Sequence, residues 1–147
     1  MFIKRVAIAE NRRKYYIKDK NVSFNANEGE ISRLDMDKEF VKTKNGEILH
    51  LYEPSFKDNF QNIKKSAAII NPKDVGMIMA YVAVTRDFIV IDAGAGSGAL
   101  CCSLAAICKK VYSYDVNQGH VDIVNENIKK LKLNNITCEL KDIYTLE

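Results

Sequence analysis

Three aspartates in the second half of the chain lie where predicted strands end, and together they could contact one ligand. Asp92 closes the first of these strands, Asp115 the second and Asp142 the third. The carboxyl ends of parallel strands meet at one edge of a sheet, where ligands of open α/β sheets bind. A carboxylate there can accept hydrogen bonds from an ammonium group, ribose hydroxyls or an amino group of adenine. Each acid alone could be a turn cap or a loop residue, but the three in register predict a ligand site.

A glycine-rich turn connects the first strand to the next helix, with the sequence Gly94-Ala95-Gly96-Ser97-Gly98-Ala99. Glycines allow positive φ and a close approach of the ligand, and helix-start amides attract anions. The spacing also satisfies the dinucleotide fingerprint, so the turn alone leaves a nicotinamide-binding domain open. Asp115 follows Gly98 by 17 residues, as a ribose-binding acid does. A cofactor with an ammonium, a ribose and an adenine but no pyrophosphate suits the three acids best, which predicts S-adenosylmethionine.

The predicted contacts place the methionine part at Asp92 and the glycine-rich turn, the ribose at Asp115 and the adenine at Asp142. The full set of candidate cofactor-binding residues is Asp92, Gly94, Gly96, Ser97, Gly98, Ala99, Asp115, Val116, Asp142 and Ile143. His120 is expected to be a surface residue beside the adenosine rather than a general base. The four cysteines and two histidines lack metal-ligand spacing, so we predict buried, reduced thiols and no metal site.

From residue 67 onward the pattern alternates between strands and helices. Asn71 and Pro72 form a helix start, and that helix should run to about Val84. The run Phe88–Ile91 is apolar throughout, which is typical of a strand buried on both faces. The remaining elements are expected at 99–108 (helix), 111–115 (strand), 119–132 (helix) and 136–140 (strand). This order predicts the βαβαβ half of a doubly wound, Rossmann-like sheet, with the first strand at an edge that something must cover.

Residues 1–66 read as a separate, small β-rich domain and connector, which places the cofactor-binding half at 67–147. Short aromatic and β-branched runs alternate with turns, and Lys44-Asn45-Gly46 is a strong hairpin signal. Residues 53–66 have no clear period and are predicted to be a connector. The first 66 residues carry 14 basic and 10 acidic side chains, against 8 and 9 in the rest. Contact with nucleic acid is one interpretation of this excess, and a solvated face is the other.

The composition excludes several classes of protein. The chain has 147 residues, 47% of them hydrophobic and 28% charged, with a formal net charge of +3. These values exclude a large multidomain enzyme and a disordered chain. No apolar run is long enough to span a membrane, and the first residues lack the apolar core of a signal peptide. The expected location is therefore the cytoplasm.

The chain resembles the archaeal tRNA (adenine-N1)-methyltransferases that modify T-loop adenines. The motifs that carry the likeness are Ile69-Ile70-Asn71-Pro72-Lys73-Asp74, Ala93 to Leu100, Ser113-Tyr114-Asp115, Glu126-Asn127-Ile128-Lys129 and Lys141-Asp142-Ile143-Tyr144. The resemblance implies a small N-terminal β domain that helps to hold tRNA, followed by a methyltransferase domain that binds S-adenosylmethionine.

The chain also departs from that family in two respects. The family commonly has Glu at the positions of Asp92 and Asp115. The two aspartates of this chain have a shorter reach but carry the same charge. Family members continue into a fourth strand with an Asp-Leu-Pro motif, whose Asp takes part in methyl transfer, so the chain corresponds to their N-terminal portion. We therefore assign no catalytic residue. The prediction is the cofactor-binding part of such an enzyme, acting with a complementary C-terminal half or as a homo-oligomer; the alternative is a non-catalytic module that binds tRNA or a partner.

Overall fold

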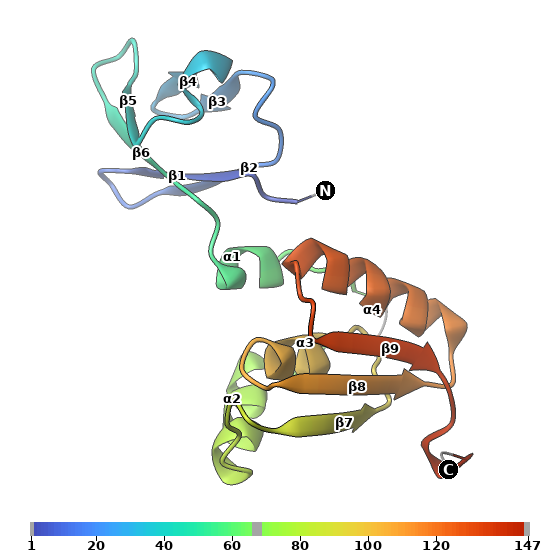
Figure 1. The fold of residues 1–147 in the computed structure, drawn as a ribbon. Helices are drawn as coiled ribbons and strands as arrows, with labels where there is room; N and C mark the ends of the chain where they lie inside the picture. Colours follow the sequence, from blue (N-terminus) through green and yellow to red (C-terminus); the bar gives the residue numbers. More distant parts are fainter. Residues whose placement is uncertain (1, 66–68, 146–147) are drawn as a thin grey trace. The chain divides into compact units, whose positions relative to one another are not determined.

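The computed structural model describes residues 2–65 and 69–145, and the chain forms two compact units, Met1–Gln61 and Asn62–Glu147 (Figure 1). The predicted domain boundary after residue 66 lies next to the undescribed residues 66–68 and stays a prediction. Among the described residues, no helix is long and apolar enough to cross a membrane.

The first unit is built on a four-stranded antiparallel sheet in the order β2-β1-β6-β5. Its strands are β1 (Arg5–Ala9), β2 (Lys14–Ile17), β5 (Phe40–Lys42) and β6 (Ile48–Tyr52). A hairpin of β3 (Phe24–Ala26) and β4 (Gly29–Ile31) and a 3-10 turn, η1 (Arg33–Asp35), complete it. Apolar side chains on one face of the sheet contribute to a core of Ala7, Ala9, Ile17, Ile31, Met36, Val41, Leu49 and Leu51.

The hairpin of β3 and β4 has a tight turn, because the two strands pair down to Ala26 and Gly29. Gly29 makes this tight turn with φ +136°. The predicted connector contains a helix, α1 (Phe56–Phe60), which begins with a capping box formed by Ser55 and Asp58.

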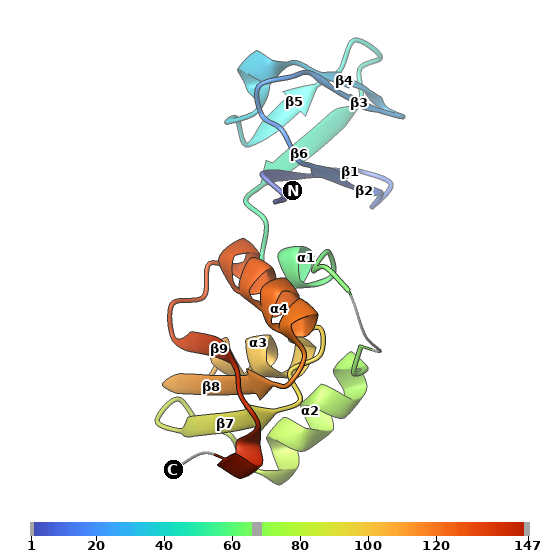
Figure 2. The same ribbon diagram turned by 90° about the vertical axis from the view of Figure 1, so that its right-hand side faces the viewer.

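The second unit contains a three-stranded parallel sheet in the order β7-β8-β9, which confirms the predicted βαβαβ arrangement. Its strands are β7 (Ile89–Ala93), β8 (Lys110–Asp115) and β9 (Ile136–Leu140). The helices are α2 (Pro72–Tyr81), α3 (Ala99–Ala105) and α4 (Gln118–Leu131), and a 3-10 turn, η2 (Ile143–Thr145), ends the described chain. Figure 2 shows α4 beside β8 and β9.

The two faces of this parallel sheet are covered differently. The face toward α3 and α4 is buried and includes Val111, Ser113 and Cys138. On the opposite face, Ile89 and Ile91 are 62% and 61% exposed. β7 lies at an edge of the sheet, as predicted, but the expectation that it is buried on both faces was wrong. The apolar sequence of β7 would suit a strand covered on both faces, but the described residues cover only the face toward α3 and α4.

Both early helices of the second unit end sooner than predicted. α2 ends at Tyr81 instead of Val84, because Ala83 adopts φ +51° and the Val84 amide bonds back to the Met79 carbonyl. α3 ends at Ala105, where Asn135 Nδ2 donates to the carbonyls of Ala105 and Cys108 and holds the chain in a turn. A left-handed residue and its turn end α2, and a side chain distant in sequence holds the end of α3, so the apolar period of each helix does not set these ends.

Candidate functional site

The glycine-rich turn between β7 and α3 has a backbone shape that depends on its glycines. Gly94, Gly96 and Gly98 have φ values of +84°, +56° and +78°. A Cβ at Gly98 would lie 3.1 Å from the Cγ atoms of Val124, so α4 packs directly against the turn. A Cβ at Gly94 would meet nothing within 4 Å, so space remains beside that residue for a ligand.

Most backbone amides of this turn already have partners within the protein. The amides of Gly94 and Ala95 both donate to the Tyr114 carbonyl, at 2.8 and 3.1 Å, and the Gly98 amide donates to the Ala95 carbonyl. The Gly96 amide donates to Asp115 Oδ2 at 2.9 Å. A pyrophosphate needs such amides as donors, so their engagement favours a ligand without one.

Asp115, the last residue of β8, is nearly buried and tightly held. Its Oδ2 accepts from Gly96 and lies 3.1 Å from His120 Nδ1, and its Oδ1 accepts from the Asn117 amide at 2.9 Å. Burial raises the pKa of this carboxyl, but the bonds from Gly96, Asn117 and His120 outweigh it and keep the pKa below its usual value. Asp115 is therefore an anion, and its remaining lone pair can accept a hydrogen bond from a hydroxyl group.

Asp92, within β7, lies on the covered face of the sheet. Ser113 Oγ donates to Asp92 Oδ2 at 2.6 Å, and Ser113 is fully buried. Burial raises the pKa of Asp92, the bonds from Ser113 and Cys101 oppose that shift, and the charge of Asp115 adds to it. A cationic amine would stabilise the charged form of this carboxylate, as the predicted ammonium contact requires.

Asp142 lies two residues beyond β9 and initiates η2. Its Oδ1 accepts from the Tyr144 amide at 3.0 Å, and its carbonyl accepts from Thr145. This is the geometry of an Asx turn, so Asp142 shapes the loop. The residue is also exposed, so a ligand can reach its carboxylate.

Two adjoining hollows lie at the carboxyl edge of the sheet and share Ala93 and Gly94. The first, of about 200 Å³, is lined by Ile70, Asp92, Gly96, Ser97, Ala99 and Leu100 with neighbours in the turn. The second, of about 310 Å³, is lined by Tyr114, Asp115, Val116, Lys141, Asp142, Ile143 and Tyr144. Every predicted contact residue except Gly98 lines one of them, and Gly98 instead packs on Val124. Their roles toward a cofactor stay predictions.

Sequence reasoning missed several residues of this site. Ile70 precedes the α2 cap and lines the first hollow, and Tyr114 and Tyr144 line the second. Tyr144 is 94% exposed, and an aromatic side chain directly after a predicted site pair was the signal that could have identified it. The contact of His120 with Asp115 was also missed, because it joins the end of β8 to the first turn of α4 and depends on how the helix is oriented.

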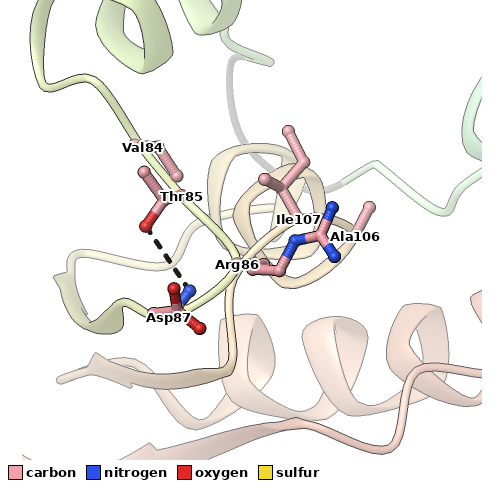
Figure 3. A pocket seen from close by; sticks show the side chains of 6 residues that line it. All are labelled: Val84, Thr85, Arg86, Asp87, Ala106 and Ile107. Carbon is pink, nitrogen blue, oxygen red and sulfur yellow. Dashed lines mark hydrogen bonds between the residues drawn. The ribbon is translucent and has the colours of Figure 1, made fainter.

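A larger hollow, of about 700 Å³, lies away from this edge (Figure 3). It is lined by Val84, Thr85, Arg86, Asp87, Ala106 and Ile107, in the loop before β7 and at the end of α3. The Asp87 amide donates to Thr85 Oγ1 there at 3.4 Å. Because it lies at the amino end of the sheet, where such folds do not bind their cofactors, we do not assign the site to it.

The cysteines and histidines form no metal centre within residues 2–65 and 69–145, where no group of three His, Cys, Asp or Glu is suited to hold an ion. All four cysteines are buried and unpaired, as predicted. Burial raises the pKa of Cys138 to about 12, so this thiol stays protonated at neutral pH.

Comparisons with known proteins indicate the family and the fold of the chain. A family model described as Protein-L-isoaspartate(D-aspartate) O-methyltransferase (PCMT) matches residues 8–145. The tRNA (adenine(57)-N(1)/adenine(58)-N(1))-methyltransferase TrmI of Methanocaldococcus jannaschii is 27% identical over 135 residues, which cover 89% of this chain and 48% of that protein. The tRNA (adenine(58)-N(1))-methyltransferase TrmI of Thermus thermophilus is 30% identical over 92 residues, covering 60% of this chain and 36% of that protein.

Solved structures confirm the predicted fold class. A SAM-dependent O-methyltransferase from Thermotoga maritima matches with a TM-score of 0.78 and 25% identity, over 96% of this chain and 56% of that one. The tRNA (m1A58) methyltransferase TrmI of Aquifex aeolicus has the same fold, with a TM-score of 0.75 and 21% identity over 100% and 62% of the two chains. The predicted resemblance is thus confirmed, and the chain spans about half the length of the Methanocaldococcus relative.

Proposed function

We propose that this chain, which belongs to the protein-L-isoaspartate(D-aspartate) O-methyltransferase (PCMT) family, is the S-adenosylmethionine-binding part of a tRNA (adenine-N1)-methyltransferase. The observation that carries this proposal is the alignment of Asp92, Asp115 and Asp142 along two adjoining hollows at the carboxyl edge of β7, β8 and β9. The engaged amides of the glycine-rich turn support a ligand without pyrophosphate, and so disfavour a nicotinamide dinucleotide.

The choice of tRNA over an isoaspartyl protein as the methyl acceptor rests on how far each relative matches. The Methanocaldococcus tRNA enzyme matches 89% of the chain, which includes most of the first unit. A protein-L-isoaspartate O-methyltransferase of Paramagnetospirillum magneticum matches 64% at 29% identity. The family model also spans most of the first unit, so the presence of that unit does not by itself choose the acceptor. The longer match to the tRNA enzyme favours RNA as the substrate, and we propose that the first unit holds it.

The residues at the sheet edge fit the parts of S-adenosylmethionine. The ionised Asp115 would accept hydrogen bonds from the ribose hydroxyls, and His120 would orient its carboxylate. Asp142 would accept from the adenine amino group, between the neighbouring Val116 and Ile143. Asp92 and the backbone of the glycine-rich turn would hold the methionine part. The bound cofactor supplies a methyl group on a sulfonium, and the protein contributes mainly proximity and alignment.

No residue of the described chain is assigned to deprotonate the acceptor nitrogen. We propose that this group lies in a segment that corresponds to the rest of the tRNA relatives and covers the open face of the sheet, where Ile89, Ile91 and Tyr112 are exposed. A second copy of the chain could cover the same face, but it would bring no such group. The alternative function is a non-catalytic module that binds the cofactor, tRNA or a partner.

The test is a tritium-transfer assay with labelled S-adenosylmethionine and unmodified tRNA. We expect no methylated adenine above background with the 147-residue chain alone, since general acid or base help is typically worth about 10²- to 10⁴-fold. Addition of a polypeptide that corresponds to the rest of the tRNA relatives should restore transfer to adenine N1. A parallel assay offers an isoaspartyl peptide, in place of tRNA, as the methyl acceptor. Robust turnover by the chain alone would refute the proposal that the deprotonating group lies in another segment, and transfer to the peptide instead of tRNA would refute the choice of acceptor.

A further inference from the structure

Asn127, in the third turn of α4, is fully buried and is not part of the proposed contact set. Its side chain makes three hydrogen bonds to backbone atoms of two distant segments. Oδ1 accepts from the Lys64 amide at 2.7 Å, and Nδ2 donates to the Lys64 carbonyl at 2.8 Å and to the Ser97 carbonyl at 3.0 Å. The side chain thus joins the segment that opens the second unit to the glycine-rich turn.

The pair of bonds to Lys64 resembles the exchange between two β-strands, in which one residue both accepts and donates. Such a bidentate contact fixes the position and the direction of the Lys64 peptide. Ile63 next to it is 6% exposed, and Lys64 Nζ forms an ion pair with Glu126 Oε2 at 2.9 Å. The backbone and side chain of Lys64 therefore hold this segment on α4, next to the buried Ile63.

The third bond reaches the part of the turn that lines the first hollow. Ser97 lines that hollow and is itself buried. One helical turn before Asn127, Val124 packs against Gly98 and supports the other side of the turn. Ile70, which follows Lys64 by six residues, lines the same hollow. The α4 face made of Val124 and Asn127 therefore supports the turn and anchors the chain that leads to Ile70.

We propose that Asn127 is a positioning residue that couples cofactor binding to the docking of the segment Ile63–Lys65. The proposal rests on the proposed cofactor site. If the turn must have its observed shape to bind the cofactor, binding stabilises the state in which Asn127 holds both segments. By linkage, undocking of Lys64 weakens cofactor binding by the same factor by which the cofactor opposes undocking. Asn127 acts on the cofactor only through Ser97 and Lys64.

Amide hydrogen exchange measures this coupling directly, because the Lys64 N–H is the proton donated to Asn127. The experiment uses the full chain and S-adenosylhomocysteine, with binding followed by calorimetry in parallel. At a ligand concentration one hundred times Kd, full coupling slows exchange at Lys64 about a hundredfold, and we expect at least tenfold. Asn127→Leu, similar in size but without hydrogen bonds, should make this exchange fast and insensitive to the ligand and weaken binding about tenfold.

Glu126→Gln is the matched control, since it removes the ion pair of the Lys64 side chain one residue away and leaves the backbone contacts in place. It should keep the ligand-dependent protection. Saturable binding by the wild-type chain with unchanged exchange at Lys64 would overturn the coupling alone. Absence of binding by the wild-type chain would overturn the cofactor assignment and the coupling with it. If Asn127→Leu fails to fold, the wild-type comparison still decides.

Discussion

The two sheets of this protein each have an exposed face, but the faces differ in chemistry. In the first unit, Lys42 and His50 lie on the exposed side of an antiparallel sheet together with the aromatic residues Phe40 and Tyr52. In the second unit, the exposed side of a parallel sheet carries the aliphatic Ile89 and Ile91 on β7, with Tyr112 beside them and Glu139 on β9. Antiparallel sheets commonly face water on one side, whereas parallel sheets are covered on both. The difference indicates that the second sheet, and not the first, is built to receive a cover.

Matched charge substitutions on the two faces of the parallel sheet should give the largest effect. Val111 is fully buried under the helices, so Val111→Asp should destabilise the second unit by more than about 4 kcal/mol through an unpaired buried charge. Ile91→Asp, on the open face of the neighbouring strand, should change the free energy of unfolding by no more than about 0.5 kcal/mol. Denaturant unfolding measures both, and equal losses would mean that the two faces are equally covered.

The first sheet is stabilised on its outer side by charge, and this should appear as a pH dependence. Asp58 of α1 pairs with Lys14 of β2 and accepts from Ser55. Burial raises the pKa of Asp58, but these contacts outweigh it and lower the pKa to about 2. A depressed folded-state pKa contributes stability above the unfolded value of about 4, and that stability is lost as the pH falls from about 4 to about 2.

Asp58→Asn should therefore cost on the order of 2 kcal/mol at pH 7, and the difference from wild type should close across that acid window. Thermal unfolding between pH 2 and pH 7 measures it. The exposed Glu10→Gln is the control. A constant difference at all pH values would refute the ionic account of Asp58.

The packing of the covered face against the glycine-rich turn predicts a somewhat smaller effect. Gly98→Ala combines a φ of +78° with a Cβ 3.1 Å from Val124 and should cost about 1 to 2 kcal/mol. Gly76→Ala, inside α2 with nothing within 4 Å of the new Cβ, should instead stabilise by roughly 0.5 to 1 kcal/mol. Opposite signs in the free energy of unfolding are the expected result, and a loss in both variants would contradict the assignment of strain to Gly98.

The elements of the second unit could be predicted from local patterns because each has a strong signal. β9 has its predicted bounds, and α4 differs from its prediction by one residue at each end, since its apolar stripe and the cap at Asn117 agree. α2 and α3 were predicted too long, because their ends depend on Ala83 in a left-handed conformation and on a side chain of Asn135 that is distant in sequence.

The candidate site was predictable where it follows strand ends and glycines. Asp92, Asp115 and Asp142 could be placed because the end of each strand fixes where the next residues lie. The contacts that hold them could not be predicted, since Ser113 beside Asp92 and His120 beside Asp115 depend on register and helix orientation. Asn127 was recognised only as part of a family motif, because a buried amide has no local signature of its partners.

Calorimetric titration with S-adenosylhomocysteine, compared with NAD, tests the central claim that this sheet edge is a methyltransferase cofactor site. We predict saturable binding of S-adenosylhomocysteine by the wild-type chain and at least tenfold weaker binding by Asp115→Ala, which loses charge-assisted hydrogen bonds worth roughly 1.5 to 3 kcal/mol each before water compensates. Asp122→Ala, on the exposed side of α4 and outside both hollows, should bind like wild type. Tighter binding of NAD, or equal affinity of wild type and Asp115→Ala for S-adenosylhomocysteine, would contradict the account.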